Sequence, residues 1–92
     1  MTLGLVAALA APGLAAAGCY ADYKAKKDNP LRLHYGVVQL SDKACANHRA
    51  AERAVARRLG AGGWKLLTVI SIFGPEGLKQ REDSAGQYFL RF

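Results

Sequence analysis

The pattern of apolar and polar positions divides the 92-residue chain into two unlike parts. Residues 1–21 carry no charged side chain, whereas every acid and base lies between Asp22 and Arg91. The apolar part has about the 20 residues that an α-helix needs to cross a bilayer. The pattern therefore predicts an apolar anchor or signal segment over residues 1–22, a basic linker over 23–30, and a small domain over 31–92.

The domain is expected to begin with a strand. Residues 31–40 alternate apolar and polar side chains with period two, which is typical of a strand. His34 lies on the more polar side of this strand, so we expect it to be exposed. Asn29-Pro30 just before it indicates a turn.

A helix is predicted to follow the first strand. Ser41-Asp42 can cap its first turn, because a short polar side chain accepts hydrogen bonds from free N–H groups there. The helix should end near Leu59, before the glycine-rich residues 60–63. One helix face is apolar at three- to four-residue spacing and should face the core; it carries Ala44, His48, Ala51, Val55 and Leu59, with His48 half-buried.

The second predicted strand, Trp64 to Phe73, is apolar on both faces. Such a strand usually lies in the centre of a sheet, with both faces covered. Residues 74–86 are expected to form a long mobile loop, and residues 87–92 a last strand that forms a hairpin with the second strand. The core anchors are expected to be Trp64, Leu66, Ile70, Val55 and Leu59.

These elements predict an α+β protein. It would contain an N-terminal apolar helix, expected to be transmembrane, and a small β-α-β-β domain in which one helix packs on an antiparallel sheet. About 60 residues bury little surface, so the domain is expected to gain stability from a partner or an oligomer.

Three interpretations of the N-terminal segment stay open. As an uncleaved anchor it would place the C-terminal domain in the cytoplasm, because lysines follow it at once. Ala15-Ala16-Ala17 would alternatively suit cleavage of a secretory signal. Ala16-Ala17-Gly18-Cys19 resembles a bacterial lipobox, which makes Cys19 a candidate lipidation site. The expected membrane segment includes Thr2, Leu3, Leu5, Val6, Leu9, Leu14 and Tyr20.

The net charge of +6 suits an anionic lipid surface, nucleic acid or an acidic protein. The candidate partner or lipid contacts lie in the linker and on the outer face of the helix: Lys24, Lys26, Lys27, Arg49, Arg53 and Arg57. Two cysteines, Cys19 and Cys45, make no disulfide framework, and we expect no bridge. No motif predicts a metal site, a cofactor site or catalytic residues, so no enzyme is expected.

The sequence resembles a small bacterial domain family that is classed only as a domain of unknown function. The resemblance rests on Val37-Val38-Gln39-Leu40, on Gly63-Trp64-Lys65-Leu66-Leu67 after a helix, and on Tyr88-Phe89-Leu90-Arg91. It covers Leu33 to Phe92. Lys65 stands where the family usually has Glu. The resemblance implies a β-α-β-β fold and supplies no catalytic residues.

For function, the leading expectation is a non-catalytic, single-span membrane accessory or assembly subunit. Its small domain would dock on a larger membrane protein complex or associate with itself as a homo-oligomer, next to membrane lipid. The first alternative is a periplasmic lipoprotein or secreted binding module acylated at Cys19. The second is a binder of nucleic acid or anionic lipid through the basic helix, although the aromatic spacing of an RNA-binding sheet is missing.

Overall fold

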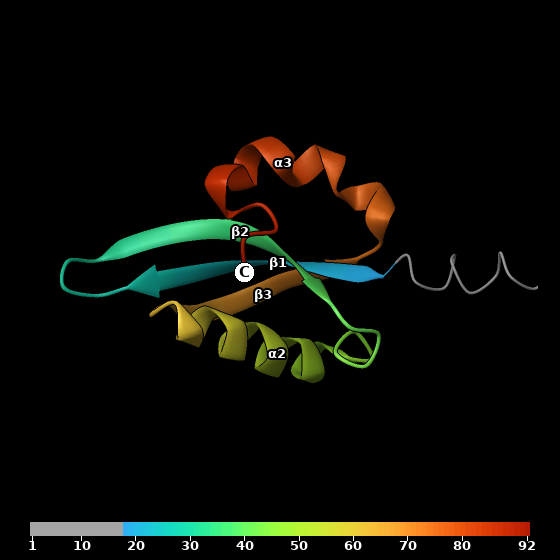
Figure 1. Ribbon diagram of the computed structural model, residues 1–92, viewed down its shortest axis with the longest axis horizontal. Coiled ribbons are helices and arrows are strands. Elements are labelled where there is room, and N and C mark those ends of the chain that lie inside the picture. Colours follow the sequence, from blue (N-terminus) through green and yellow to red (C-terminus); the bar gives the residue numbers. More distant parts are fainter. Residues whose placement is uncertain (1–17) are drawn as a thin grey trace, which may run out of the picture.

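The computed structural model describes residues 18–92. The expected membrane positions from Thr2 to Leu14 therefore lie outside the described residues. Within residues 18–92, no helix has the length and apolar character needed to cross a membrane. The described part is a small α+β domain with a three-stranded antiparallel sheet and two α-helices. Figure 1 shows α2 against one face of the sheet and α3 over the other.

The sheet has the strand order β2-β1-β3. Strand β1 spans Cys19–Lys27, β2 spans Arg32–Leu40 and β3 spans Lys65–Phe73. Helix α2, His48–Ala61, connects β2 to β3. After β3 come a short 3-10 turn η1 (Pro75–Gly77), helix α3 (Lys79–Ala85) and a second 3-10 turn η2 (Gly86–Tyr88).

The predicted β-α-β-β order is wrong, because the expected linker contains the central strand. Residues 19–27 pair with β2 on one side and with β3 on the other. In β1, Ala21, Tyr23 and Ala25 alternate with polar residues and are fully buried. Lys24 and Lys26 alternate with these apolar residues, so the segment has the composition of a polar linker although its pattern has period two. Tyr20, expected at a membrane interface, is instead a buried residue of β1.

Strand β3 is an edge strand rather than the expected central one. Its only strand partner within residues 18–92 is β1, and their register shifts twice, between Asp22 and Tyr23 and between Lys24 and Ala25. Such irregularities bend a strand and increase its twist. The predicted hairpin between β3 and residues 87–92 is also wrong, because Phe89 and Leu90 contact Val37 of β2 instead.

Helix α2 begins later than expected. Its N-cap is Asn47, whose side chain accepts a hydrogen bond of 2.8 Å from the Ala50 N–H. Ser41 instead caps a local turn, where its hydroxyl accepts from the Ala44 N–H. His48, expected to be half-buried, has 54% of its side chain exposed and faces Glu52 at 3.3 Å. The helix ends at Ala61, with Gly62 as its C-cap.

The main core lies between α2 and the sheet. It combines the buried face of α2 (Ala51, Ala54, Val55 and Leu59) with Trp64 and with residues from all three strands. A smaller cluster on the opposite face joins Tyr20, Val37 and Ala85, with Phe73, Leu78 and Phe89 beside them. This second cluster fixes α3 to the sheet, although the sequence predicted a mobile loop there.

The last residues lie along the outer edge of β2. Phe89 makes an isolated parallel bridge with Val37, and the Leu90 N–H donates to the Val37 carbonyl at 2.8 Å. Leu90 adopts a positive φ of 56°, which turns the chain away from β2 after this contact. The C-terminal segment thus covers part of the β2 edge without forming the expected strand.

Candidate functional site

The two edges of the sheet differ in how they are covered. Beside β2, the C-terminal segment supplies hydrogen bonds and apolar contacts through Phe89 and Leu90. Beside β3, the structure from residue 18 onward places no strand. An uncovered edge presents free backbone N–H and C=O groups, and these can pair with another strand.

Apolar side chains accompany the free edge of β3. Leu67 is 51% exposed and Ile70 is 46% exposed. The expectation that Ile70 anchors the core is therefore corrected. Both residues lie at the register shifts between β1 and β3, where one residue of β3 has no partner in β1. The two irregularities thus explain why a strand that is apolar on both faces keeps two large side chains in contact with water.

A groove of about 580 Å³ lies between the free edge of β3 and helix α2. Its walls are apolar at Ala56, Trp64 and Leu66, and its rim carries Glu52, Arg53 and Lys65. The groove therefore offers apolar contact next to free backbone groups, with charges of both signs at its rim.

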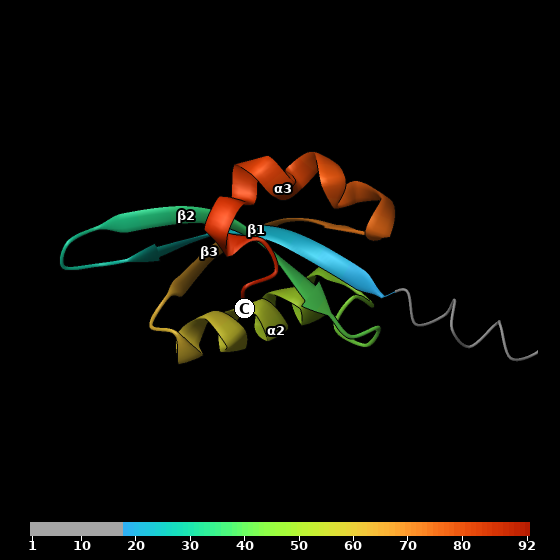
Figure 2. The same ribbon diagram turned by 45° about the horizontal axis from the view of Figure 1, so that its top comes forward.

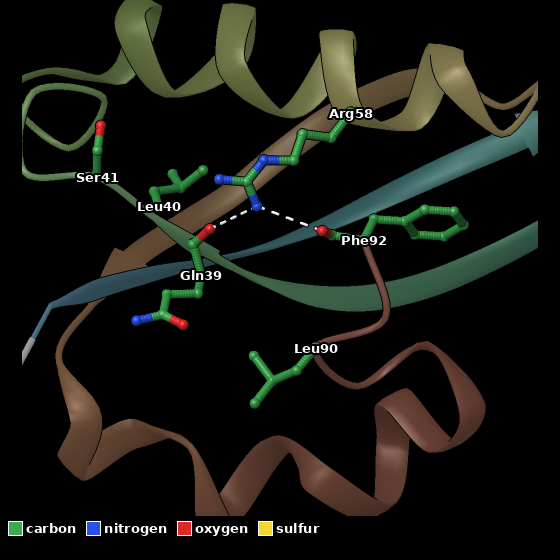
Figure 3. A pocket seen from close by; sticks show the side chains of 6 residues that line it. All are labelled: Gln39, Leu40, Ser41, Arg58, Leu90 and Phe92. Atoms are coloured by element: carbon green, nitrogen blue, oxygen red, sulfur yellow. Dashed lines mark hydrogen bonds between the residues drawn. The ribbon is translucent and has the colours of Figure 1, made fainter.

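A second hollow, of about 370 Å³, lies where the C-terminal segment meets α2 and the end of β2 (Figure 3). Here the Arg58 guanidinium donates to the Gln39 carbonyl at 2.7 Å and to the Phe92 carbonyl at 3.3 Å. Leu90 points into the same region from the opposite wall. Arg58 thus holds the last residue of the chain against the sheet, which favours a structural role for this hollow.

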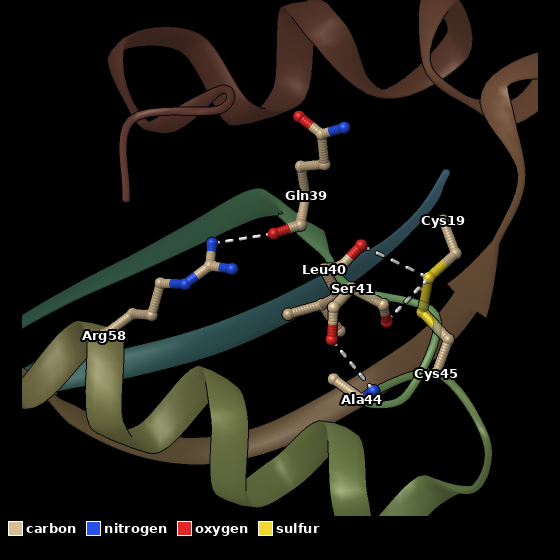
Figure 4. The surroundings of a disulfide bond; sticks show 7 residues. All are labelled: Cys19, Gln39, Leu40, Ser41, Ala44, Cys45 and Arg58. Carbon is tan, nitrogen blue, oxygen red and sulfur yellow. Dashed lines mark hydrogen bonds between the residues drawn. A yellow bond between two sulfur atoms is a disulfide. The ribbon is translucent and has the colours of Figure 1, made fainter. Parts of the chain in front are cut away.

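Cys19 and Cys45 form a disulfide, contrary to the expectation of free cysteines (Figure 4). The bond joins the first residue of β1 to the turn before α2. The Cys19 sulfur also lies 3.5 Å from the Leu40 carbonyl oxygen and 3.4 Å from that of Ser41. A sulfur in a disulfide has no proton and no free valence. The disulfide and acylation of the Cys19 sulfur therefore exclude each other.

Asp22 is the only buried acid in the described part of the chain, with 4% of its surface exposed. It accepts hydrogen bonds from the Ser71 N–H at 2.9 Å and hydroxyl at 2.7 Å, from the Tyr35 hydroxyl at 2.8 Å, and from Arg81 Nε at 3.0 Å. Burial raises the pKa of Asp22, but these hydrogen bonds and the Arg81 charge outweigh burial and lower it. Burial, together with the Asp22 hydrogen bond, raises the pKa of Tyr35 to about 12.

His34 is buried, although the sequence predicted exposure. Its Nε2 shares a hydrogen bond of 2.8 Å with the Tyr23 hydroxyl, while its Nδ1 has no hydrogen-bond partner among residues 18–92. The Tyr88 ring stacks on the imidazole at 3.7 Å between centroids, and Trp64 meets it edge-on at 4.3 Å. Burial, and then the charge of Lys27, lower the pKa of His34. Burial raises the pKa of Tyr23.

The six candidate basic contacts separate into two groups. Lys24, Lys26 and Lys27 lie on β1, towards its hairpin with β2. Arg49, Arg53 and Arg57 lie on α2, and all three are exposed. Within residues 18–92, no three His, Cys, Asp or Glu residues gather in a way that could hold a metal ion.

The sequence carried signals for two features that were missed. Ala21, Tyr23 and Ala25 repeat with the period of a strand and end next to Pro30, which could have indicated β1. Gly36 marks the packing of the buried tyrosine, because a Cβ atom there would overlap the Tyr23 ring. No sequence signal places Asp22 beside Arg81, since they are 59 residues apart and meet only in the folded sheet.

Comparisons with protein-family models, with curated proteins and with solved structures found no match. The resemblance to the bacterial domain family therefore stays a prediction.

Proposed function

We propose that the protein is an exported, non-catalytic assembly module that associates with a second copy of itself through the free edge of β3. The observation that carries this proposal is the contrast between the two sheet edges. One edge is covered by the C-terminal segment, and the other exposes Leu67 and Ile70 and has no neighbouring strand within residues 18–92. Proteins usually protect a long apolar edge strand, and pairing with another strand is one way to do so.

Two copies of β3 can pair antiparallel about a two-fold axis. Each copy then presents the same surface to the other, as in most homodimers. The start of β3 carries Lys65, and Glu76 follows its end. Antiparallel pairing brings the basic end of one strand to the acidic end of the other. The charges are therefore complementary, and the product is a continuous six-stranded sheet.

The groove beside β3 supports the same partner. Its rim carries Glu52 and Arg53, which are neighbours on α2. Across a two-fold axis, such a pair can meet its opposite charges in the second copy. Apolar side chains of the added strand can pack against Ala56 and Leu66, which line the groove.

Export is supported by the Cys19–Cys45 disulfide, because structural disulfides persist mainly in oxidising compartments. Cleavage after Ala15-Ala16-Ala17 would leave Gly18 and the whole of β1 in the mature chain. We therefore favour a cleaved signal over the cytoplasmic placement expected from the lysines. A mature chain that still begins at Met1, found by mass spectrometry of the protein from its native cell, would contradict this part of the proposal.

Sedimentation equilibrium of residues 18–92 with the disulfide intact tests the association. The wild type should form a dimer in a concentration-dependent manner. Ile70→Lys and Ile70→Asp should each weaken it by about 100-fold, because both copies lose an apolar contact at the axis. Using both signs of charge separates lost burial from a simple charge effect.

Leu31→Lys is the matched control, because Leu31 is 62% exposed and lies away from the β3 edge. Its dimer should match the wild type. Hydrogen exchange should show slower exchange at residues 67–71 in the dimer. A wild type that stays monomeric at every concentration, or a dimer that tolerates both Ile70 variants, would refute edge pairing through β3.

A further inference from the structure

We propose that the protein also docks on an anionic phospholipid bilayer, through the part of the sheet that α3 leaves uncovered. This surface, called the open face, consists of Lys24, Lys26, Leu33, Tyr35 and Leu67. The inference does not require self-association, because most of this surface is the broad face of the β1–β2 hairpin. Leu67 is the one residue that it shares with the proposed contact at the edge of β3.

The register of the sheet places these residues together. Lys24 pairs with Tyr35 and Lys26 pairs with Leu33, so the four side chains lie on one face. Leu67 comes from β3 and lines the same hollow as Lys24 and Leu33, with a volume of about 310 Å³. Further along this face, Asp22 and Val37 lie beneath α3 and its neighbours.

The hairpin extends beyond both helices (Figure 1, Figure 2). The uncovered half of the face therefore lies at one end of the molecule, where a flat surface can approach without meeting α3. Leu33 is 65% exposed and Leu31, in the turn of the hairpin, is 62% exposed. These are the two most exposed large apolar residues of the described chain, and both lie at this end.

The charges of the open face are almost all positive. Lys24 is exposed, and no acid lies within ion-pair distance of it in the part of the chain from residue 18 onward. Lys26 is 3.4 Å from Asp28, the one acid of the hairpin turn. Asp22 is buried under α3 and is neutralised by Arg81. Three other acids, Glu76, Glu82 and Asp83, lie on the connection after β3 and on α3.

Exposed leucines beside lysines fit the interface of an anionic bilayer. The leucines can enter the boundary between head groups and acyl chains, while the lysine stems reach the phosphates. Nucleic acid fits less well, because Tyr35 is the aromatic residue of the face and its hydroxyl is bonded to Asp22. The leucines would gain nothing against a phosphate backbone.

Vesicle co-sedimentation of residues 18–92 with the disulfide intact tests the proposal. The vesicles contain either phosphatidylcholine alone or phosphatidylcholine with phosphatidylglycerol. Binding should require phosphatidylglycerol and should weaken as salt rises, since the surface potential is screened. Equal binding to both vesicles, or no binding to either, would overturn the proposal.

Two sets of variants locate the contact. Lys24→Gln with Lys26→Gln should lower the partition coefficient about 25-fold, at about fivefold for each lysine near the surface. Leu33→Ser should lower it about tenfold through lost burial. The matched control is Arg49→Gln with Arg57→Gln, which removes the same charge from α2 on the other side of the sheet.

The control pair should reduce binding by less than about threefold, since those charges would stay far from the bilayer. Equal losses from the two charge pairs would show attraction by net charge alone and would overturn the assignment to the open face. All these side chains are exposed or half-buried, and circular dichroism checks that each variant is folded. A fluorescent single-stranded oligonucleotide serves as a competitor. Complete displacement of the protein from the vesicles, by an oligonucleotide that carries the same total charge as the anionic lipid, would favour nucleic acid as the partner.

Ile70→Lys separates this proposal from the proposed function. It should abolish the dimer and leave vesicle binding by the monomer measurable. Loss of the dimer in Ile70→Lys with vesicle binding retained would support both proposals. A monomeric wild type that binds anionic vesicles would refute only self-association.

Discussion

At the scale of single residues, His34 shows how a polar group can become part of an aromatic core. Its imidazole lies among Tyr23, Trp64, Tyr88 and Phe92. Lys27 lies with its ammonium 4.7 Å from the centre of the Trp64 ring. Burial and this nearby cation both oppose protonation of His34, so the neutral imidazole is the form that fits the fold.

This arrangement predicts a loss of stability in mild acid. The pKa of His34 is lowered in the folded state, so between that value and about 6.5 the unfolded chain binds a proton that the folded chain does not. The free energy of unfolding should therefore fall as pH falls from about 7 to 5, with a slope of at most about 1.4 kcal/mol per pH unit. Urea unfolding across this range measures the slope.

His34→Phe keeps an aromatic ring at this position and should remove the slope, although it leaves the Tyr23 hydroxyl without its partner. The control is His48→Gln, at the exposed histidine of α2, and it should keep the slope of the wild type. A slope that survives in His34→Phe would assign the pH dependence to another group.

At the scale of elements, one buried carboxylate joins all three strands to α3. Asp22 belongs to β1, Tyr35 to β2, Ser71 to β3 and Arg81 to α3. Helix α3 has only seven residues, and no side chain caps its start. So short a helix is marginal alone. Its position therefore depends on Asp22 and on the apolar cluster around Ala85.

Asp22→Asn should destabilise the protein by about 2–3 kcal/mol, because Arg81 loses the charge of its partner while remaining half-buried. The effect should be largest in α3, as faster hydrogen exchange of its amides. The pKa of Asp22 is lowered in the folded state, so its contribution is present above about pH 4 and is lost as pH falls through the folded pKa.

In Asp22→Asn, the free energy of unfolding should no longer include the decrease that protonation of Asp22 causes in acid. Asp83→Asn is the matched control, because Asp83 is an exposed acid on the same helix. An equal loss in both variants would argue against a special role for the buried carboxylate.

Elements with uninterrupted apolar patterns were easier to predict than elements whose partners are distant. The stripe of Ala51, Val55 and Leu59 is enough to orient α2, because helical spacing is local. In β1, lysines at alternate positions give a linker-like composition, and only pairing on both sides makes residues 19–27 a strand. Helix α3 was missed for the same reason, since Asp22 and the core cluster hold it in place.

The candidate site depended on tertiary structure even more. Ile70 is apolar, and the sequence pattern alone places it in the core. Its exposure follows from the position of β3 at the edge and from the register shift opposite β1, which are properties of the whole sheet. The lysines of the open face could be selected as candidate lipid contacts, but Leu33 could be added to them only from the strand register.

At the scale of the whole molecule, the Cys19–Cys45 disulfide stabilises a domain with a small core. The two cysteines are separated by 26 residues. Closing a loop of that length restricts the unfolded chain and should stabilise the folded state by about 3–4 kcal/mol. We predict that Cys19→Ala with Cys45→Ala lowers the free energy of unfolding in urea by this amount.

A reducing agent should lower the stability of the wild type to that of the double variant and leave the double variant unchanged. Thiol titration of the unfolded protein confirms the state of the bond in each sample. A wild type whose unfolding is indifferent to reductant, with its thiols shown to be free, would contradict a stabilising role.

Strand β1 comes first in the sequence and lies in the centre of the sheet, and this determines the order in which the strands can pair. A chain that leaves a ribosome or a membrane pore with its N-terminus first releases the central strand before either neighbour. Strand β2 follows after a short turn, and Cys45 emerges soon after it, so the hairpin can be tied covalently to the coming helix. Until β3 emerges, one whole side of β1 has no neighbour. During synthesis or export, the chain therefore passes through a stage in which β1, the central strand of the folded sheet, has one exposed edge that can pair with another chain.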